Sequence, residues 1–139
     1  MRGAVGNERE LERVLTHEFT HALVQSVAPR GVPTWLNEGL AVMFEPDGDA
    51  WSERELASSD KRLTLGQLDG GFGGLSTGDA RIAYAQSAAI VRALLDRGGP
   101  PVVVGIMQDL ARGDSFPAAI ERRLAVPFDG FIASLEASR

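Results

Sequence analysis

The stretch His17-Glu18-Phe19-Thr20-His21 decides how the rest of this sequence is interpreted. Its first and last residues are the only two histidines of the chain. On an α-helix, side chains four residues apart lie one turn apart on the same face, so both imidazoles can reach a single metal ion. Glu18 is rotated by about 100° from His17 and can face the metal without binding it. The stretch therefore predicts a helix that carries a metal site.

A catalytic zinc site usually has three protein ligands. The chain has no cysteine and no further histidine, so the third ligand is expected to be a carboxylate. Glu38 and Glu45 are the candidates, seven residues apart on nearly the same face of a second predicted helix. Glu38 is favoured because it follows a turn-rich link and stands near the start of that helix. The alternative interpretation of Glu38 is an acid that complements the helix dipole.

This set of ligands favours zinc and predicts hydrolysis, with Glu18 as the general base that accepts a proton from the attacking water. The expected substrate is a peptide or protein. Two other functions are compatible with the same residues. One is a zinc-binding structural or regulatory module that does not cleave, and the other is a helical interaction domain without a metal.

The composition narrows the class of protein and its possible partners further. The chain has 139 residues, of which 44% are hydrophobic and 24% charged, as expected for one ordinary domain spanning residues 1–139. A net charge of −5 argues against nucleic acid and anionic membranes as partners. No apolar run approaches the roughly 20 residues that span a bilayer. The sequence predicts neither the cellular compartment nor the oligomeric state.

Capping residues and periodicity predict a mainly helical chain. Asn7, Thr34, Ser52 and Ser115 are predicted N-caps, and either Thr77 or Asp79 is predicted to cap a long helix that Gly98-Gly99 ends. The expected helices span residues 7–28, 35–45, a short stretch from 52, 79–97, 102–111, 117–124 and 127–135. Residues 102–104 are alternatively a buried strand, and the glycine-rich segment 60–78 is either disordered or a flap that lines a cleft.

The first predicted helix is amphipathic. Its apolar residues gather about 140° away from the two histidines, so one side is expected to pack into a core while the other presents the metal site. These apolar residues are Leu11, Leu15, Phe19, Ala22 and Leu23.

HEFTH followed by Trp35-Leu36-Asn37-Glu38-Gly39-Leu40-Ala41 resembles the gluzincin zinc metallopeptidases. The likeness is greatest to the peptidase MA-like group and more distant to the M1 aminopeptidases. It covers about residues 8–135, including the stretch from Tyr84 to Gly98, which resembles the helix that follows the active site. The resemblance implies a zincin-like catalytic helical domain.

Carried onto this sequence, the resemblance implies that His17, His21 and Glu38 are zinc ligands and that Glu18 is the general base. Gluzincins often supply a tyrosine or histidine from a later helix to stabilise the oxyanion. Tyr84, the only tyrosine, is the candidate here. Its alternative role is that of a core tyrosine with one hydrogen bond. Asn37, Glu45 and backbone carbonyls are candidate partners for the second imidazole nitrogens.

Two departures from the family matter. Larger relatives carry a β-sheet before the active-site helix, whereas only sixteen residues precede His17. The sheet is therefore expected to be short or absent, in a fragment of a longer protein or in a minimal version. No stretch resembles the motif with which M1 aminopeptidases recognise a substrate amino-terminus, so an endopeptidase is expected rather than an exopeptidase.

Overall fold

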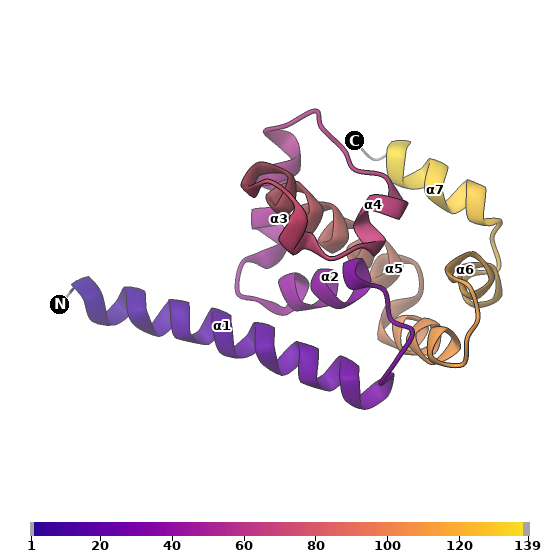
Figure 1. Ribbon diagram of the computed structural model, residues 1–139, viewed down its shortest axis with the longest axis horizontal. Coiled ribbons are helices and arrows are strands. Elements are labelled where there is room, and N and C mark those ends of the chain that lie inside the picture. The colour runs from indigo at the N-terminus through magenta and orange to yellow at the C-terminus, as the bar shows by residue number, and fades with distance from the viewer. Residues whose placement is uncertain (1, 138–139) are drawn as a thin grey trace.

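The computed structural model describes residues 2–137, and over these residues the chain is helical without any strand (Figure 1). The mainly helical class and the missing sheet are thereby confirmed for the part described. The elements in chain order are α1 (Arg2–Val27), α2 (Thr34–Phe44), α3 (Gly48–Ala57), α4 (Leu65–Asp69), the 3-10 turn η1 (Phe72–Gly74), α5 (Thr77–Ala111), α6 (Phe116–Leu124) and α7 (Phe128–Ala137).

Two helices begin earlier than their predicted caps. α1 starts at Arg2, so Asn7 lies inside it, and α3 starts at Gly48, so Ser52 lies inside it. The Ser52 hydroxyl donates a hydrogen bond to the carbonyl of Asp49 at 2.8 Å. Serine makes such bonds inside helices as well as capping bonds at their ends. A residue with capping chemistry therefore does not exclude helix before it.

The caps of α2 and α5 also differ by one residue from the prediction. Thr34 is the first helical residue of α2, and the N-cap position belongs to Pro33. The hydroxyl of Ser76, rather than of Thr77, caps α5 by accepting the Asp79 N–H at 3.1 Å. The predicted Ser115 cap of α6 is confirmed.

α5 is interrupted at Gly99, where the predicted stop is confirmed. Gly99 has φ 72° and ψ −177°, a conformation open in practice only to glycine. Pro100 and Pro101 then occupy the first turn of the second half, where a missing N–H costs no helical hydrogen bond. Residues 102–104 are helical, so the alternative of a buried strand is wrong.

α5 is the central helix, and α2, α3 and α6 pack against it (Figure 1). Trp35, Leu36 and Leu40 of α2 are almost fully buried. α2 approaches α5 most closely at Gly39, where an added Cβ would lie 2.5 Å from the carbonyl oxygen of Ser87. Only a glycine fits there, and the close approach fixes the position of the neighbouring Glu38.

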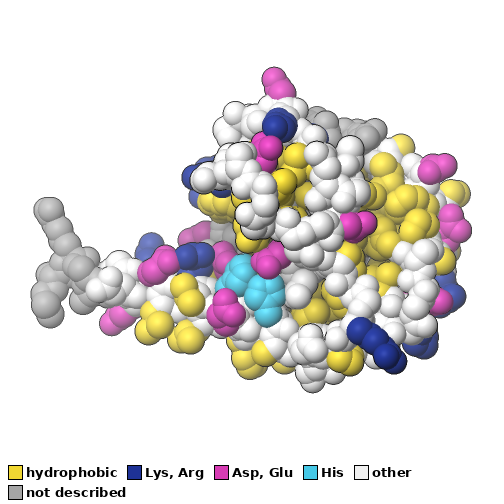
Figure 2. Space-filling model, viewed as in Figure 1, with side chains coloured by type: hydrophobic (Ala, Val, Ile, Leu, Met, Phe, Trp, Pro, Cys, Tyr) yellow, Lys and Arg dark blue, Asp and Glu magenta, His cyan; other side chains and the backbone are white. Residues whose placement is uncertain are grey.

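The side of α1 that packs is not the predicted one. Leu11, Leu15 and Phe19 are 57%, 59% and 65% exposed, and the buried residues of α1 are instead Thr20 and Val24. The apolar side of α1 points away from the side that carries the histidines. α1 packs mainly on α2, through the histidine side. The N-terminal half of α1 extends beyond the other helices, and yellow side chains line its outer surface (Figures 1 and 2).

The segment between α3 and α5 is held against α5 by hydrogen bonds and by buried apolar side chains. The side-chain amide of Gln86 accepts the Leu63 N–H at 2.8 Å and donates to the Leu63 carbonyl at 3.0 Å. Leu63, Leu68 and Phe72 are buried, and the segment contains the short helix α4. The segment is therefore part of the packed body.

A buried carboxylate joins α5 to α6. Asp109 is fully buried and accepts two hydrogen bonds from the Arg123 guanidinium, at 2.9 and 2.8 Å. Arg112 and Arg122 also pair with it. The hydrogen bonds from Arg123, followed by the positive charges of the three arginines, lower the pKa of Asp109 despite its burial.

Candidate metal centre

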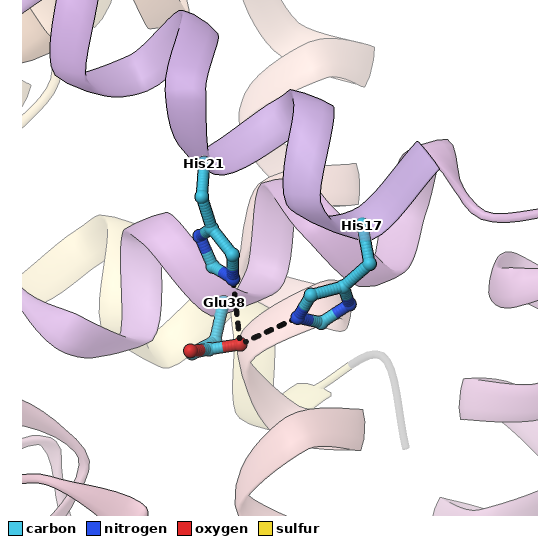
Figure 3. A group of neighbouring side chains, drawn as sticks. All are labelled: His17, His21 and Glu38. Carbon is cyan, nitrogen blue, oxygen red and sulfur yellow. Dashed lines mark ion pairs between the residues drawn. The ribbon is translucent and has the colours of Figure 1, made fainter. Parts of the chain in front are cut away.

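Two histidines from α1 and one glutamate from α2 meet at a single point (Figure 3). The Nε2 atoms of His17 and His21 lie 3.2 and 3.4 Å from Oε2 of Glu38. One ligand atom from each residue lies within 4.8 Å of the others. The two imidazole rings meet edge to face, with centroids 4.6 Å apart. Among the described residues, no other group of metal-binding side chains is assembled in this way.

Glu38 Oε2 is the atom that indicates a cation. It is buried and has no hydrogen-bond partner in the described part of the chain, although a buried carboxylate oxygen without one is costly. Two ligands at zinc distances of about 2.0–2.1 Å in a tetrahedral arrangement lie roughly 3.3 Å apart. The Nε2–Oε2 separations of 3.2 and 3.4 Å fit that spacing, so the three residues suit zinc.

Each histidine is oriented by an acceptor on its other nitrogen. His17 Nδ1 lies 2.5 Å from Oε1 of Glu45, and His21 Nδ1 lies 2.7 Å from Oδ1 of Asn37. Both acceptors come from α2 or its C-terminal cap. Nδ1 can donate to each of these oxygens, which leaves both Nε2 lone pairs free for a metal. The sequence did not indicate which of Asn37 and Glu45 would contact a histidine, and in the structure each accepts a hydrogen bond from one of them.

Arg13 belongs to the same network and was not singled out by the sequence. It lies one turn before His17 on α1, and its Nη1 is 3.8 Å from Oε1 of Glu45. The four-residue spacing from His17 was the signal that placed it on this side of the helix. Its positive charge offsets part of the negative charge that Glu45 brings to the site.

Glu18 lies beside the metal group rather than within it. Its side chain is exposed and makes no hydrogen bond or ion pair with a described residue. On the wheel of α1 it is rotated by about 100° from His17, toward the outer side of the helix. Glu18 is therefore not part of the candidate metal group itself.

Tyr84 stands on α5 with its ring packed edge-on against buried Phe72, the ring centroids 5.0 Å apart. Tyr84 itself is only partly buried. Burial, followed by the negative charges of Glu38 and Glu45, raises the pKa of its phenol above the ordinary value. The phenol therefore stays protonated at neutral pH.

Fold and site together define a helical domain of the zincin type, with two histidines on one helix and a glutamate on the next. The Peptidase MA superfamily, a family of metallopeptidases, matches residues 7–136. The chain therefore belongs to the Peptidase MA superfamily. No curated protein and no solved structure gave a significant match. Within residues 2–137, no helix is long and apolar enough to cross a membrane.

Proposed function

We propose that the chain is one zinc-dependent peptidase domain and acts as an endopeptidase. The observation that carries the proposal is the buried Oε2 of Glu38, without a hydrogen-bond partner and between the Nε2 atoms of His17 and His21. Membership of the Peptidase MA superfamily supports both the metal and a peptide or protein substrate. Histidine and carboxylate ligands without cysteine suit zinc at a catalytic rather than a structural site.

Zinc, when bound, supplies the Lewis acidity that lowers the pKa of water and polarises the peptide carbonyl. Glu18 accepts the proton of the attacking water on its carboxylate and delivers it to the nitrogen of the leaving amine. Glu45 and Asn37 keep the two imidazoles in the tautomer that leaves Nε2 free. Tyr84 donates a hydrogen bond from its phenol to the oxyanion that forms from the peptide carbonyl. Its raised pKa keeps the phenol protonated for this role.

Replacing Glu18 with Gln tests the role of the base. Glu18→Gln should retain one zinc per chain and lose hydrolysis by roughly 10²–10⁴-fold, the range attributed to general acid–base catalysis. The substrate is a peptide library blocked at both termini, which only an endopeptidase cleaves. Glu12→Gln, another exposed glutamate of α1, is the matched control and should retain both properties.

Cleavage that survives Glu18→Gln would exclude this mechanism. One zinc per chain without turnover in the unmodified protein would support the alternative of a zinc-binding structural or regulatory module. Absence of zinc after reconstitution would exclude both.

A further inference from the structure

Glu45 faces two side chains of α1 with the same oxygen atom. Its Oε1 lies 2.5 Å from Nδ1 of His17 and 3.8 Å from Nη1 of Arg13, so an imidazole and a guanidinium meet at one point. The Glu45 side chain is only 11% exposed, whereas that of Arg13 is 46% exposed. A carboxylate with so little access to water needs polar or charged partners, and Arg13 supplies the positive charge.

Arg13 is itself oriented by a second carboxylate. Its Nε donates to Oε2 of Glu10 at 3.1 Å, and its Nη2 pairs with Oε1 of the same side chain. A guanidinium presents its nitrogens in a rigid planar fork, so two bonds to one carboxylate fix its plane. The remaining nitrogen, Nη1, is the one that lies against Glu45. The two glutamates therefore contact different sides of one guanidinium.

The turn after α2 fixes the backbone from which Glu45 reaches α1. The Glu45 N–H donates to the Val42 carbonyl at 3.1 Å, and the Glu45 carbonyl accepts the Gly48 N–H at 3.0 Å. Gly48 leaves no room for a side chain, because an added Cβ would overlap the carbonyl oxygen of Val42. The backbone is thus held at both ends, and the direction of the carboxylate depends on what its side chain contacts.

The two histidines have unlike acceptors. His21 faces the neutral amide oxygen of Asn37, whereas His17 faces the carboxylate of Glu45. A charged acceptor makes the stronger hydrogen bond. A carboxylate beside a metal position can also turn and bind the metal itself, since carboxylates are common zinc ligands. A guanidinium on the same oxygen favours the orientation in which the carboxylate faces the imidazole.

We propose that Arg13 is a positioning residue, which holds the Glu45 carboxylate against Nδ1 of His17 and so keeps Nε2 of that imidazole free for the metal. Glu10 takes part by fixing the plane of the guanidinium. The proposal rests on the proposed function only where it concerns zinc, because the contact between Glu45 and His17 needs no metal.

The direction of the change in zinc affinity separates this role from plain charge repulsion. Arg13→Gln removes a positive charge near a cation site, which by Coulomb's law alone should tighten zinc binding. If Arg13 acts through Glu45, the same variant should weaken zinc binding by about 2–5-fold, the effect of one partly exposed ion pair. In a Glu45→Gln background it should no longer weaken binding, because the charge on which Arg13 acts is gone. Competition with a chromophoric chelator measures these affinities.

Nitrogen-15 NMR of the imidazoles measures the positioning without zinc. The chemical shifts of Nδ1 and Nε2 report which nitrogen carries the hydrogen, and Glu45→Gln identifies the signals of His17 among those of only two histidines. In Arg13→Gln the fraction of His17 with its hydrogen on Nδ1 should fall, whereas His21 should be unchanged. The matched control is Arg9→Gln, which removes the same charge from the exposed surface of α1 one turn earlier. It should change neither the histidine signals nor the zinc affinity.

An unchanged His17 tautomer in Arg13→Gln, or zinc binding as tight as in the parent protein or tighter, would overturn the proposal and leave the proposed function intact. A changed His17 tautomer in a chain that binds no zinc would have the opposite meaning. It would support Arg13 as a positioning residue and overturn the proposed metal function instead.

Discussion

At the scale of single residues, the site depends on which nitrogen of each imidazole is free. The Nδ1 atoms of His17 and His21 face Glu45 and Asn37, so both Nε2 atoms point to Glu38. An acceptor on Nδ1 fixes the tautomer and strengthens the opposite nitrogen as a ligand. If the group holds zinc as proposed, Glu45 and Asn37 should therefore affect the affinity without binding the metal themselves.

Glu45→Gln should weaken zinc binding. The amide keeps the size of the side chain but loses the charge that strengthens the His17 donor bond, so the zinc affinity should fall by about 10–100-fold. Competition with a chromophoric chelator measures the affinity. Glu53→Gln on α3 exchanges an exposed glutamate that makes no described contact with the site and should leave the affinity unchanged. Equal affinities for Glu45→Gln and the parent protein would remove Glu45 from the site.

Tyr84 should titrate late. The folded state favours the neutral phenol, so its pKa is higher in the folded than in the unfolded chain. The stability that the phenol contributes is therefore complete below the unfolded pKa of about 10 and is lost as the pH rises through the folded pKa. Tyr84 is the only tyrosine, so tyrosinate absorbance measures it directly. The midpoint of the metal-free native protein should lie above that of the denatured chain. Coinciding midpoints would mean that the phenol is fully solvated.

At the scale of elements, α2 brings the third ligand to α1 because of its close approach to α5. That approach needs a glycine at position 39, next to Glu38. The backbone of Ser87 cannot move away without shifting α5, which carries buried residues from Ile82 to Leu110. The position of the proposed ligand Glu38 thus depends on a contact that the neighbouring residue Gly39 makes with α5.

Gly39→Ala should therefore damage both stability and metal binding. The added methyl group overpacks the contact with Ser87, which costs about 1–3 kcal/mol of unfolding free energy or more. It also displaces Glu38, so zinc affinity should fall. Urea unfolding and chelator competition measure the two effects. Gly73→Ala is the control, because an added Cβ there has open space and should change neither property.

The elements themselves could largely be predicted from the sequence, as could the three residues of the candidate metal group. The four-residue spacing of His17 and His21 and the absence of cysteine left only acids for the third position. Periodicity also separated the two sides of α1, but the prediction that the apolar side is the buried one was wrong. Burial depends on which helix lies alongside, and α1 packs mainly on α2, a contact between helices that the pattern of α1 alone does not contain.

At the scale of the whole molecule, the candidate metal group lies where α1 joins the other helices. α1 makes most of its contacts with α2, and its N-terminal half extends past the other helices (Figure 1). Two of the three proposed ligands lie on α1 and one on α2. A metal that bridges these helices therefore stabilises their packing as well as any chemistry.

Removal of the metal should lower the melting temperature. A ligand present at 100 times its dissociation constant stabilises the native state by about 2.7 kcal/mol, which corresponds to several degrees for a domain of this size. Thermal unfolding with zinc and with excess chelator measures the difference. Glu38→Gln, which loses a ligand, should unfold at the same temperature in both conditions. An equal zinc effect in that variant would place the bound metal elsewhere.

The consecutive order of the two ligand-bearing helices also bears on how the protein folds. His17, His21 and Glu38 all lie within the first 38 residues and are separated only by a short turn. Bringing them together closes a small loop, whose entropic cost is low compared with that of long-range contacts. Closing this loop with zinc therefore costs little chain entropy, and α5 must still pack against Gly39 before Glu38 reaches its final position.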